Sequence, residues 1–350
     1  FENSGGLADI VTTENGQLVP RENTDSLADA VLCHLANPGM IKVKGEAGRR
    51  MVEDRFNFNN YVRDLLGMLE EAPVTVSAIV PNYNYARYLP DRLDSILHQS
   101  WGVGEIIVLD DASSDESVEI LKKYRRLHPH RIKLILNEKN SGNVFAQWEK
   151  GLKAATGDFV WIAEADDGSE PDFVKESMLR FLQDDKVSMT FAQSKQMDEN
   201  NNHLADDFLH YVEKAGTMDF NQDFVVDGRE YIVQALSIKN TVLNVSSVMF
   251  RNKDFSSELA LAREYKVAGD WQFYVSLLEE GGRFSYIRQP LNRHRIHQNS
   301  ASHSLNNRRH YDEVVQMQKY VAERFPPGAD EEELRVFRAD LRSYLGVQED

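Results

Sequence analysis

The sequence predicts an α/β fold in which a mostly parallel β-sheet carries α-helices on both faces. Between residues 74 and 163, short β-rich runs alternate with amphipathic segments, which is the pattern of repeated strand–helix–strand units. Acidic and amide side chains follow four of these runs in succession. The chain has 350 residues, of which 41% are hydrophobic and 27% charged, enough for a buried core in two or three domains.

The expected strands are short apolar runs rich in β-branched residues. They span residues 74–80, 105–109, 131–136 and 159–163. The expected helices have apolar side chains at every third or fourth position. They span residues 88–99, 116–126 and 144–155. Residues 195–222 are polar with little periodicity, so we expect a loop or short helices there.

Three domains are expected, at residues 1–72, 73–305 and 306–350. In the first, Asn15-Gly16 predicts a turn before a short strand at Leu18-Val19. Two helices should follow, over residues 25–35 and 57–70. The residues before Pro73 form a plausible linker, because proline ends helices. The third domain is highly charged with helical spacing, which predicts a C-terminal helical appendage.

The composition excludes some partners. A formal net charge of −16 argues against nucleic acid, whose phosphates require clustered Lys and Arg. Cys33 is the only cysteine, so no intrachain disulfide can form, and its apolar neighbours predict a small core residue. No apolar run approaches the ~18 residues of a membrane span. We expect a cytoplasmic protein without a transmembrane segment, for which peripheral association with the inner face of the membrane stays open.

Polar side chains at the strand ends predict where a ligand binds. The four groups begin with Pro81-Asn82-Tyr83-Asn84, Asp110-Asp111, Asn140-Ser141-Gly142 and Glu164-Ala165-Asp166-Asp167. Any one of them is explained by the capping of a helix or the end of a strand. Four together at the carboxyl ends of parallel strands converge on one crevice, which is where such sheets bind ligands.

The acids Glu164, Asp166 and Asp167 indicate a divalent cation. Packed carboxylates repel one another unless a cation lies among them. Hard oxygen ligands suit Mg²⁺ or Mn²⁺, and such an ion would neutralise charge growing on a departing diphosphate. The alternative is an acidic surface turn.

Taken together, these motifs resemble the family 2 glycosyltransferases, over about residues 74–304. The resemblance implies the GT-A fold, an inverting reaction and a nucleotide-sugar donor, most plausibly a UDP-sugar, with a glycan or other hydroxyl acceptor. It implies donor contacts from one set of residues: Pro81, Tyr83, Asn84, Asp110, Asp111, Asn140, Gly142, Glu164, Asp166 and Arg295. Glu164 stands where the family has the first Asp of its Asp-x-Asp metal motif, so its contact is open.

The same resemblance assigns the catalytic base and the metal ligands. Asp270, followed by Trp271, stands where the family has its general base, although an acid there could also serve only the helix dipole. His297 is implied as a metal ligand with Asp166 and Asp167. The alternative for His297 is an ordinary loop histidine, and His294 is expected to pack.

Residues 3–70 resemble something different, the C-terminal tail of family 4 glycosyltransferases of the GT-B fold. The resemblance rests on Gly5-Gly6, on 14–20 and on Gly48-Arg49-Arg50. The donor-binding acids of that family would precede Phe1, so we expect no activity from this segment. The chain then looks like part of a fusion of two transferases.

The sequence therefore predicts a metal-dependent, inverting glycosyltransferase. One alternative is a catalytically silent module that binds a sugar nucleotide or glycan. A second is a nucleotidyl transferase, which would be expected to have a Gly-rich loop with Lys or Arg after the first strand, where this chain has Pro81-Asn82-Tyr83-Asn84.

Overall fold

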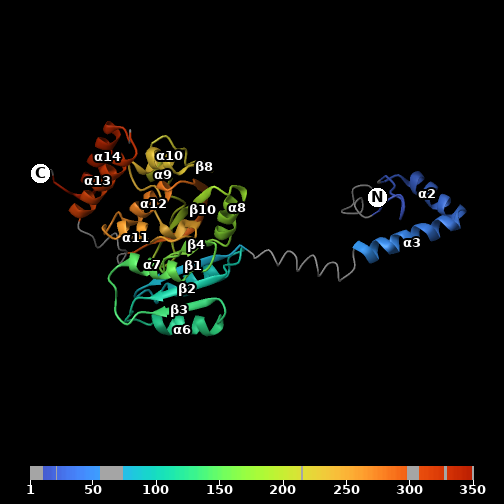
Figure 1. Ribbon diagram of the computed structural model, residues 1–350, viewed down its shortest axis with the longest axis horizontal. Coiled ribbons are helices and arrows are strands. Elements are labelled where there is room, and N and C mark those ends of the chain that lie inside the picture. The colour runs from blue at the N-terminus through green and yellow to red at the C-terminus, as the bar shows by residue number, and fades with distance from the viewer. Residues whose placement is uncertain are drawn as a thin grey trace. The chain divides into compact units, whose positions relative to one another are not determined.

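The computed structural model describes residues 11–20, 22–55, 74–213, 216–297, 307–326 and 329–348. The chain divides into two compact units, residues 1–73 and 74–350, and each is described by itself (Figure 1).

The described part of the first unit contains two helices, α2 (Thr24–Ala36) and α3 (Pro38–Arg55). The Asn23 side chain caps α2 by accepting a hydrogen bond from the backbone N–H of Ser26, which satisfies one of the free donors at a helix start. The helix predicted at residues 25–35 is confirmed, but Leu18-Val19 forms no strand. Cys33 is exposed, which corrects the expected core position. The helix predicted at residues 57–70 lies outside the described residues.

The second unit is built on one sheet whose strand order is β3-β2-β1-β4-β9-β6-β10-β5, with β7 beside β6 and β8 beside β10. The strands are β1 (Val76–Asn82), β2 (Glu105–Asp110), β3 (Ile132–Leu136), β4 (Phe159–Ile162), β5 (Gly168–Ser169), β6 (Val187–Asp198), β7 (His203–Ala205), β8 (Phe224–Asp227), β9 (Val248–Arg251) and β10 (Arg283–Ile296). The block β3-β2-β1-β4 is parallel, β6 and β10 are parallel, and β9 joins the two blocks by antiparallel pairing.

Helices and short turns of helix cover the sheet. They are α5 (Leu89–Leu97), α6 (Ser117–Leu127), α7 (Val144–Ala154), α8 (Phe173–Gln183), α9 (Leu209–Val212), α10 (Gly228–Tyr231), η1 (Ile232–Leu236), η2 (Val245–Ser247), α11 (Ser256–Ala262), α12 (Gly269–Glu279), α13 (Asn307–Arg324) and α14 (Glu331–Leu345).

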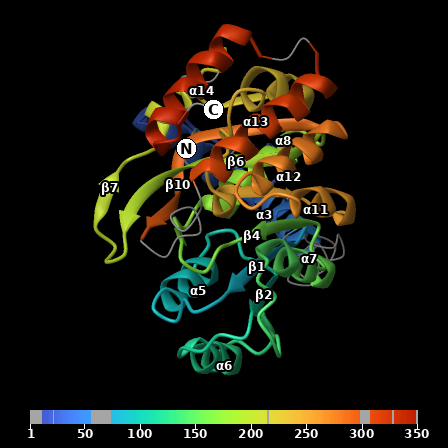
Figure 2. The same ribbon diagram turned by 90° about the vertical axis from the view of Figure 1, so that its left-hand side faces the viewer.

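The predicted arrangement of helices on both faces is confirmed by two separate hydrophobic cores. Side chains alternate along a strand, so neighbours in β1 enter opposite cores. Ile79 packs in the core that contains Trp148 of α7, and Val80 packs in the core that contains Leu93 of α5. Figure 2 shows α5 and α7 on opposite sides of β1 and β2. All seven residues of β1 are buried, as expected for the centre of a parallel block.

The expected loop at residues 195–222 is only partly right. Strand β6 continues to Asp198, and β7 pairs with it antiparallel before the short helix α9. The polar residues Lys195, Gln196 and Asp198 at the end of β6 obscured the strand. Pairing with β10 keeps them in the sheet, where they are half-buried.

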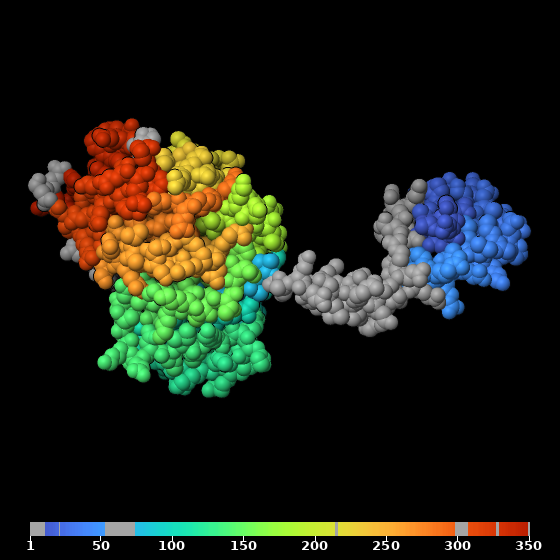
Figure 3. Space-filling view, in the orientation of Figure 1, coloured from blue at the N-terminus to red at the C-terminus, as the bar shows by residue number. Residues whose placement is uncertain are grey.

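The predicted C-terminal helices form and pack onto the second unit. Val314, Met317 and Val321 of α13 enter the core that also holds the apolar side of α12. Figure 3 shows the α13–α14 segment, in red, against the yellow and orange segments of the same unit. Within the part of the chain that the structure describes, no helix has both the length and the apolar character needed to cross a membrane.

Candidate functional site

Two adjoining cavities lie at the carboxyl edge of the parallel strands. The first, of about 320 Å³, is lined by Pro81, Asn82, Tyr83, Tyr85, Asp111, Asn140, Gly142, Asn143, Val144, Gln147 and Glu164. The second, of about 300 Å³, is lined by Tyr85, Val144, Phe145, Trp148, Glu164, Asp166, Asp167, Leu243, Asn244, Val245, Lys266, Val267, Asp270, His294 and Arg295. Tyr85, Val144 and Glu164 belong to both, so the cavities form one cleft. The predicted convergence of the strand ends is therefore found.

In the first cavity, paired polar groups fix the shape of the floor. Asp110 at the end of β2 accepts hydrogen bonds from Asn82 at the end of β1 (2.7 Å) and from the N–H of Ser113 (3.0 Å). Residues Asn84 and Ala112 have φ of 58° and 60°, which is the left-handed region and marks tight turns at these strand ends. Asp110 and Asn84 do not line this cavity, and they act here by shaping it.

Asp111 organises the loop between β3 and α7. Its carboxylate accepts hydrogen bonds from Asn137, from both the N–H and the hydroxyl of Ser141, and from Gln147, at 2.6 to 3.0 Å. Asp111 is only 5% exposed, and these donors compensate the burial of its charge. The loop thereby presents Asn140 and Gly142 to the cavity, together with Pro81 and Tyr83 from the other side.

Glu164 occupies the point where the two cavities meet. Its Oε1 accepts a hydrogen bond from the indole Nε1 of Trp148 at 3.0 Å. Burial, and next the charge of Asp166, raise the pKa of Glu164 to about 8. The family has Asp at this position. The longer side chain of Glu164 reaches Trp148 of α7 and lines both cavities where they meet.

Asp166, which lines the second cavity, contacts His297, which is buried and lines neither cavity. Asp166 Oδ2 lies 3.0 Å from His297 Nε2, and the rings of Tyr85 and Tyr88 pack against the imidazole at 5.6 and 5.4 Å between centroids. Nδ1 of His297 is buried and has no hydrogen-bond partner among the residues that the structure describes. The described residues contain no group of three or more His, Cys, Asp or Glu that could hold a metal by themselves. One carboxylate and one imidazole fit Mg²⁺ or Mn²⁺ only as a partial ligand set completed by donor phosphates and water.

The carboxylate of Asp167 is hydrogen-bonded to other groups of the protein. Asp167 is 3% exposed and accepts hydrogen bonds from the backbone N–H of Arg295 (2.9 Å) and from Asn244 Nδ2 (3.0 Å). These two bonds tie the acidic turn after β4 to β10 and to the segment before η2. The geometry thus makes Asp167 a support for the turn that carries Asp166, and its predicted metal contact stays a prediction.

Arg295, which we expected at the donor diphosphate, is 2% exposed and bound to protein oxygens. Its guanidinium donates to four residues, namely Asp91, Asp166, Asp198 and Asn201. It also lies over the ring of Tyr88 at 4.5 Å. Four of its five N–H groups donate to the protein, and Arg295 also lines the second cavity, so its predicted diphosphate contact stays a prediction. These hydrogen bonds hold the acidic turn to α5 and to the turn between β6 and β7.

Asp270 lies in the first turn of α12 and lines the second cavity. Its carboxylate accepts hydrogen bonds from the backbone N–H of Trp271 (2.7 Å) and from Asn240 Nδ2 (3.2 Å). Burial raises the pKa of Asp270 to about 6, although both hydrogen bonds favour its charged form. A carboxylate with a pKa near 6 is charged and only moderately solvated at neutral pH, which suits a general base.

Two tertiary contacts fix the start of α12. The carboxylate of Glu313 on α13 accepts hydrogen bonds from the backbone N–H groups of Lys266, Val267 and Ala268, directly before the helix. Gly269 allows close packing, since a Cβ there would lie 2.4 Å from the Phe145 ring. The C-terminal helices therefore help to position Asp270.

Several of these residues escaped sequence reasoning. Trp148, Asn240 and Glu313 contact the site from helices and loops that carry no recognisable motif. Asn244, at the start of η2, was assigned no role from the sequence. His294 packs against Phe208 as expected, with 5.6 Å between ring centroids.

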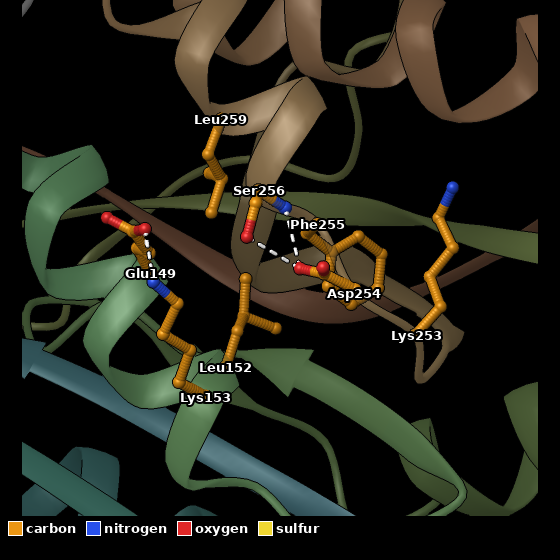
Figure 4. Close-up of a pocket in the computed structure, with 8 residues that line it drawn as sticks. All are labelled: Glu149, Leu152, Lys153, Lys253, Asp254, Phe255, Ser256 and Leu259. Carbon is orange, nitrogen blue, oxygen red and sulfur yellow. Dashed lines mark hydrogen bonds and ion pairs between the residues drawn. The ribbon is translucent and has the colours of Figure 1, made fainter.

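Another cavity, of about 340 Å³, lies away from this edge (Figure 4). It is lined by the second half of α7 and by the segment after β9. That segment lies at the amino end of β4, where the N–H of Asn252 donates a hydrogen bond to the carbonyl oxygen of Asp158. Figure 4 shows Glu149 paired with Lys153, Asp254 bonded to Ser256, and Lys253 pointing away. Glu149 and Asp254 are paired with other lining residues, and Lys253 pairs with Glu258 and Glu280 outside the lining, so this cavity offers no comparable chemistry.

Comparison with known proteins gives one family. The family model described as Glycosyl transferase family 2 matches residues 77–253, about half of the chain. TuaG of Bacillus subtilis (strain 168), a glycosyltransferase named for teichuronic acid biosynthesis, is 27% identical over 227 residues, which covers 65% of this chain and 81% of TuaG. Glycosyltransferase GlyG of Streptococcus pneumoniae serotype 4 is 27% identical over 201 residues, 57% of this chain and 52% of GlyG.

The chain spans less than two thirds of several relatives, including GlyG and the Escherichia coli (strain K12) glycosyltransferase YibD, of which it covers 31%. Among solved structures, S. aureus TarS 1–349 in complex with UDP-GlcNAc has a TM-score of 0.52 and 20% identity, over 76% of this chain and 71% of TarS 1–349. This likeness shows that the second unit has a GT-A-type fold.

Proposed function

The chain belongs to glycosyl transferase family 2, and from this premise we propose that it transfers a sugar from a nucleotide-diphosphate sugar to a hydroxyl group of a glycan or related acceptor, with inversion at the anomeric carbon. The observation that carries the proposal is the second cavity. It brings Asp270, with a pKa of about 6, into the same space as Glu164 and Asp166 at the carboxyl edge of the sheet.

The donor would lie along the cleft. The first cavity, between Tyr83 and the loop of Asn140 and Gly142, would hold the nucleoside, and the diphosphate would lie near Asp166 and His297. We propose a UDP-sugar, since TarS, which shares the fold, was solved with UDP-GlcNAc. Asp110 and Asp111 would act by holding the cavity walls in place, as their hydrogen bonds indicate.

The reaction would be one displacement. Asp270 accepts the proton of the acceptor hydroxyl, the oxygen forms a bond to the anomeric carbon, and the bond from that carbon to the diphosphate oxygen breaks. The electron pair leaves with the nucleoside diphosphate. Asp166 and His297 would hold Mn²⁺ or Mg²⁺ together with donor phosphates, and that ion would supply charge stabilisation to the leaving group. Hydrogen bonds from the N–H of Trp271 and from Asn240 orient the carboxylate of Asp270 and favour its charged form.

The test uses purified protein and a panel of nucleotide sugars with Mn²⁺, with and without chelator. We expect binding of one donor class and metal-dependent release of its nucleoside diphosphate. Asp270→Asn should keep donor binding by calorimetry and lose transfer by about 10²-fold to 10⁴-fold, the usual contribution of a general base. Asp254→Asn, in the cavity of Figure 4, is the matched control and should behave like the wild type.

Near-native turnover of Asp270→Asn would show that another group takes the proton. Donor binding without any turnover by the wild type, with every acceptor offered, would favour the silent binding module instead.

For residues 3–70 we propose a tail of a family 4 glycosyltransferase without activity of its own. Its described helices α2 and α3 carry no group of metal-ligating side chains and belong to a separate compact unit. A chain of residues 74–350 should then release nucleoside diphosphate at the rate of the whole chain. A lower rate with unchanged folding would contradict this.

The cytoplasmic location of the protein stays a prediction.

A further inference from the structure

A third cavity, of about 450 Å³, lies between the C-terminal helix α14 and the segments around α9 and Lys239. It is lined by His210, Tyr211, Lys239, Glu332, Glu333, Val336, Phe337 and Asp340. All five of its α14 residues lie beyond residues 77–253, the part of the chain that the family model matches. This cavity is therefore walled by a helix outside the matched transferase region.

Two short segments connect this cavity to the candidate active site. In the first, Phe208 precedes α9 and packs against His294, which lines the cavity of Asp270, while Tyr211 of α9 lines the third cavity. In the second, Lys239 lines the third cavity, and its neighbour Asn240 donates a hydrogen bond to Asp270 Oδ2. The charge of Asp270, after burial, contributes to raising the pKa of Tyr211 to about 12, which supports their proximity.

The α14 wall presents apolar and acidic groups side by side. Residues 332, 333, 336, 337 and 340 recur at helical spacing, so they share one face. Val336 is 48% exposed, although it is an apolar residue, and Phe337 packs against the core beside it. The three carboxylates border this apolar strip.

The opposite wall carries the ammonium group of Lys239. The ammonium of Lys239 donates to the carbonyl oxygen of Tyr211 and lies 4.3 Å from the centroid of the Tyr211 ring and 5.8 Å from that of Phe337. Lys239 is only 3% exposed, so its charge is held within the wall. Among the described lining residues, three carboxylates face one lysine, and the Glu332 carboxylate is paired with Arg335, so the remaining excess of negative charge is small and disfavours anionic groups.

We propose that this third cavity binds a neutral saccharide unit of the acceptor, at a distance from the unit whose hydroxyl faces Asp270, since none of the described residues lines both cavities. The inference rests on the proposed function. A sugar ring has an apolar C–H face, which matches Val336 and Phe337, and hydroxyl groups, which donate well to carboxylates such as Asp340. A uronate or phosphate at this position would face like charges. The cavity volume lies within the range of small-molecule sites, which is about 300–1,000 Å³.

The experiment begins with a glycan array that carries neutral saccharides and saccharides with uronate or phosphate groups, probed with the whole chain. Bound glycans should be neutral. The best of them then serves as acceptor in a transfer assay with the wild type, Val336→Arg and Asp340→Asn. Both side chains are exposed, so these variants should fold, which thermal unfolding checks. Leu182→Arg, at an exposed apolar residue of α8, is the control.

We expect Val336→Arg to raise the acceptor KM by at least about tenfold, because the larger side chain fills the cavity and adds a positive charge to it. Asp340→Asn should raise the acceptor KM less. Slow hydrolysis of the donor without acceptor should stay unchanged in both, because the donor cleft is untouched. An unchanged KM in Val336→Arg, binding of anionic glycans only, or no glycan bound by the wild type would overturn the proposal. If the wild type does not hydrolyse any donor, the proposed function fails instead, so the two failures are distinguishable.

Discussion

Asp166 Oδ2 lies 3.0 Å from His297 Nε2, although 131 positions separate the two residues in the chain. The contact forms because the turn after β4 and the end of β10 meet at the same edge of the sheet, where the backbone N–H of Arg295 donates a hydrogen bond to the carboxylate of Asp167. A carboxylate and an imidazole at this distance share the space in which a cation and a donor diphosphate would bind.

The first prediction concerns this pair. His297→Ala should weaken Mn²⁺ binding in the presence of the donor nucleotide by at least about tenfold, since even indirect supports of metal ligands contribute that much. Electron paramagnetic resonance of free Mn²⁺ measures the binding without relying on activity. His203→Ala is the matched control, because His203 Nε2 lies 3.1 Å from Asp206 Oδ1 in an exposed pair. Equal Mn²⁺ affinity in both variants would remove His297 from the ligand set.

The second prediction concerns pH. The pKa of Asp270 is about 6 in the folded chain and 3.8 as its ordinary value, so the folded state binds the proton more tightly. The free energy of unfolding should therefore fall as pH rises from 4 to 7, by about 2 kcal/mol relative to Asp270→Asn, which cannot titrate. Urea unfolding of both proteins at the two pH values measures the difference. A difference that stays constant, or that grows with pH, would contradict the raised pKa.

The third prediction concerns Asn240. Its hydrogen bond to Asp270 favours the charged carboxylate, so Asn240→Ala should raise the pKa of Asp270 further. The transfer rate, which should increase with pH around a midpoint near 6 in the wild type, would then have a higher midpoint and a lower maximum. Asn252→Ala is the control, since Asn252 donates to Gly157 O at the opposite edge of the sheet. A merely structural role of Asn240 would lower the rate at every pH without moving the midpoint.

The fourth prediction concerns Gly269. A Cβ at this position would lie 2.4 Å from Phe145 Cζ and 2.6 Å from Ala262 O, so Gly269→Ala must push α12 away from α7. We expect a loss of about 1–3 kcal/mol in the free energy of unfolding, as for other overpacked sites, and slower transfer because Asp270 moves. Gly102→Ala, where a Cβ would meet nothing within 4 Å, should change stability by no more than about 0.5–1 kcal/mol. Equal stability of the two variants would show that the contact with Phe145 is readily relieved.

Local pattern was sufficient for much of the fold. The strands β1 to β4 and the helices between them follow from apolar periodicity, and their parallel order brings Asn82, Asp110 and Glu164 to one edge. The segment from 195 to 222 was harder to predict, because its polar residues 195, 196 and 198 belong to β6 through pairing with β10, and a local pattern does not show pairing with a distant strand.

The sequence by itself determined the family, the GT-A-type sheet and the edge at which the candidate site lies, because strand ends and their polar residues are local features. Only the tertiary structure decided what each side chain contacts. Arg295 has the residue type of a phosphate ligand, yet its guanidinium is buried among four protein oxygens. Glu164 reaches Trp148, and Asp270 is held by Asn240 and, through the loop before α12, by Glu313. Hydrogen bonding and desolvation depend on which groups meet in space, and those groups come from segments far apart in the chain.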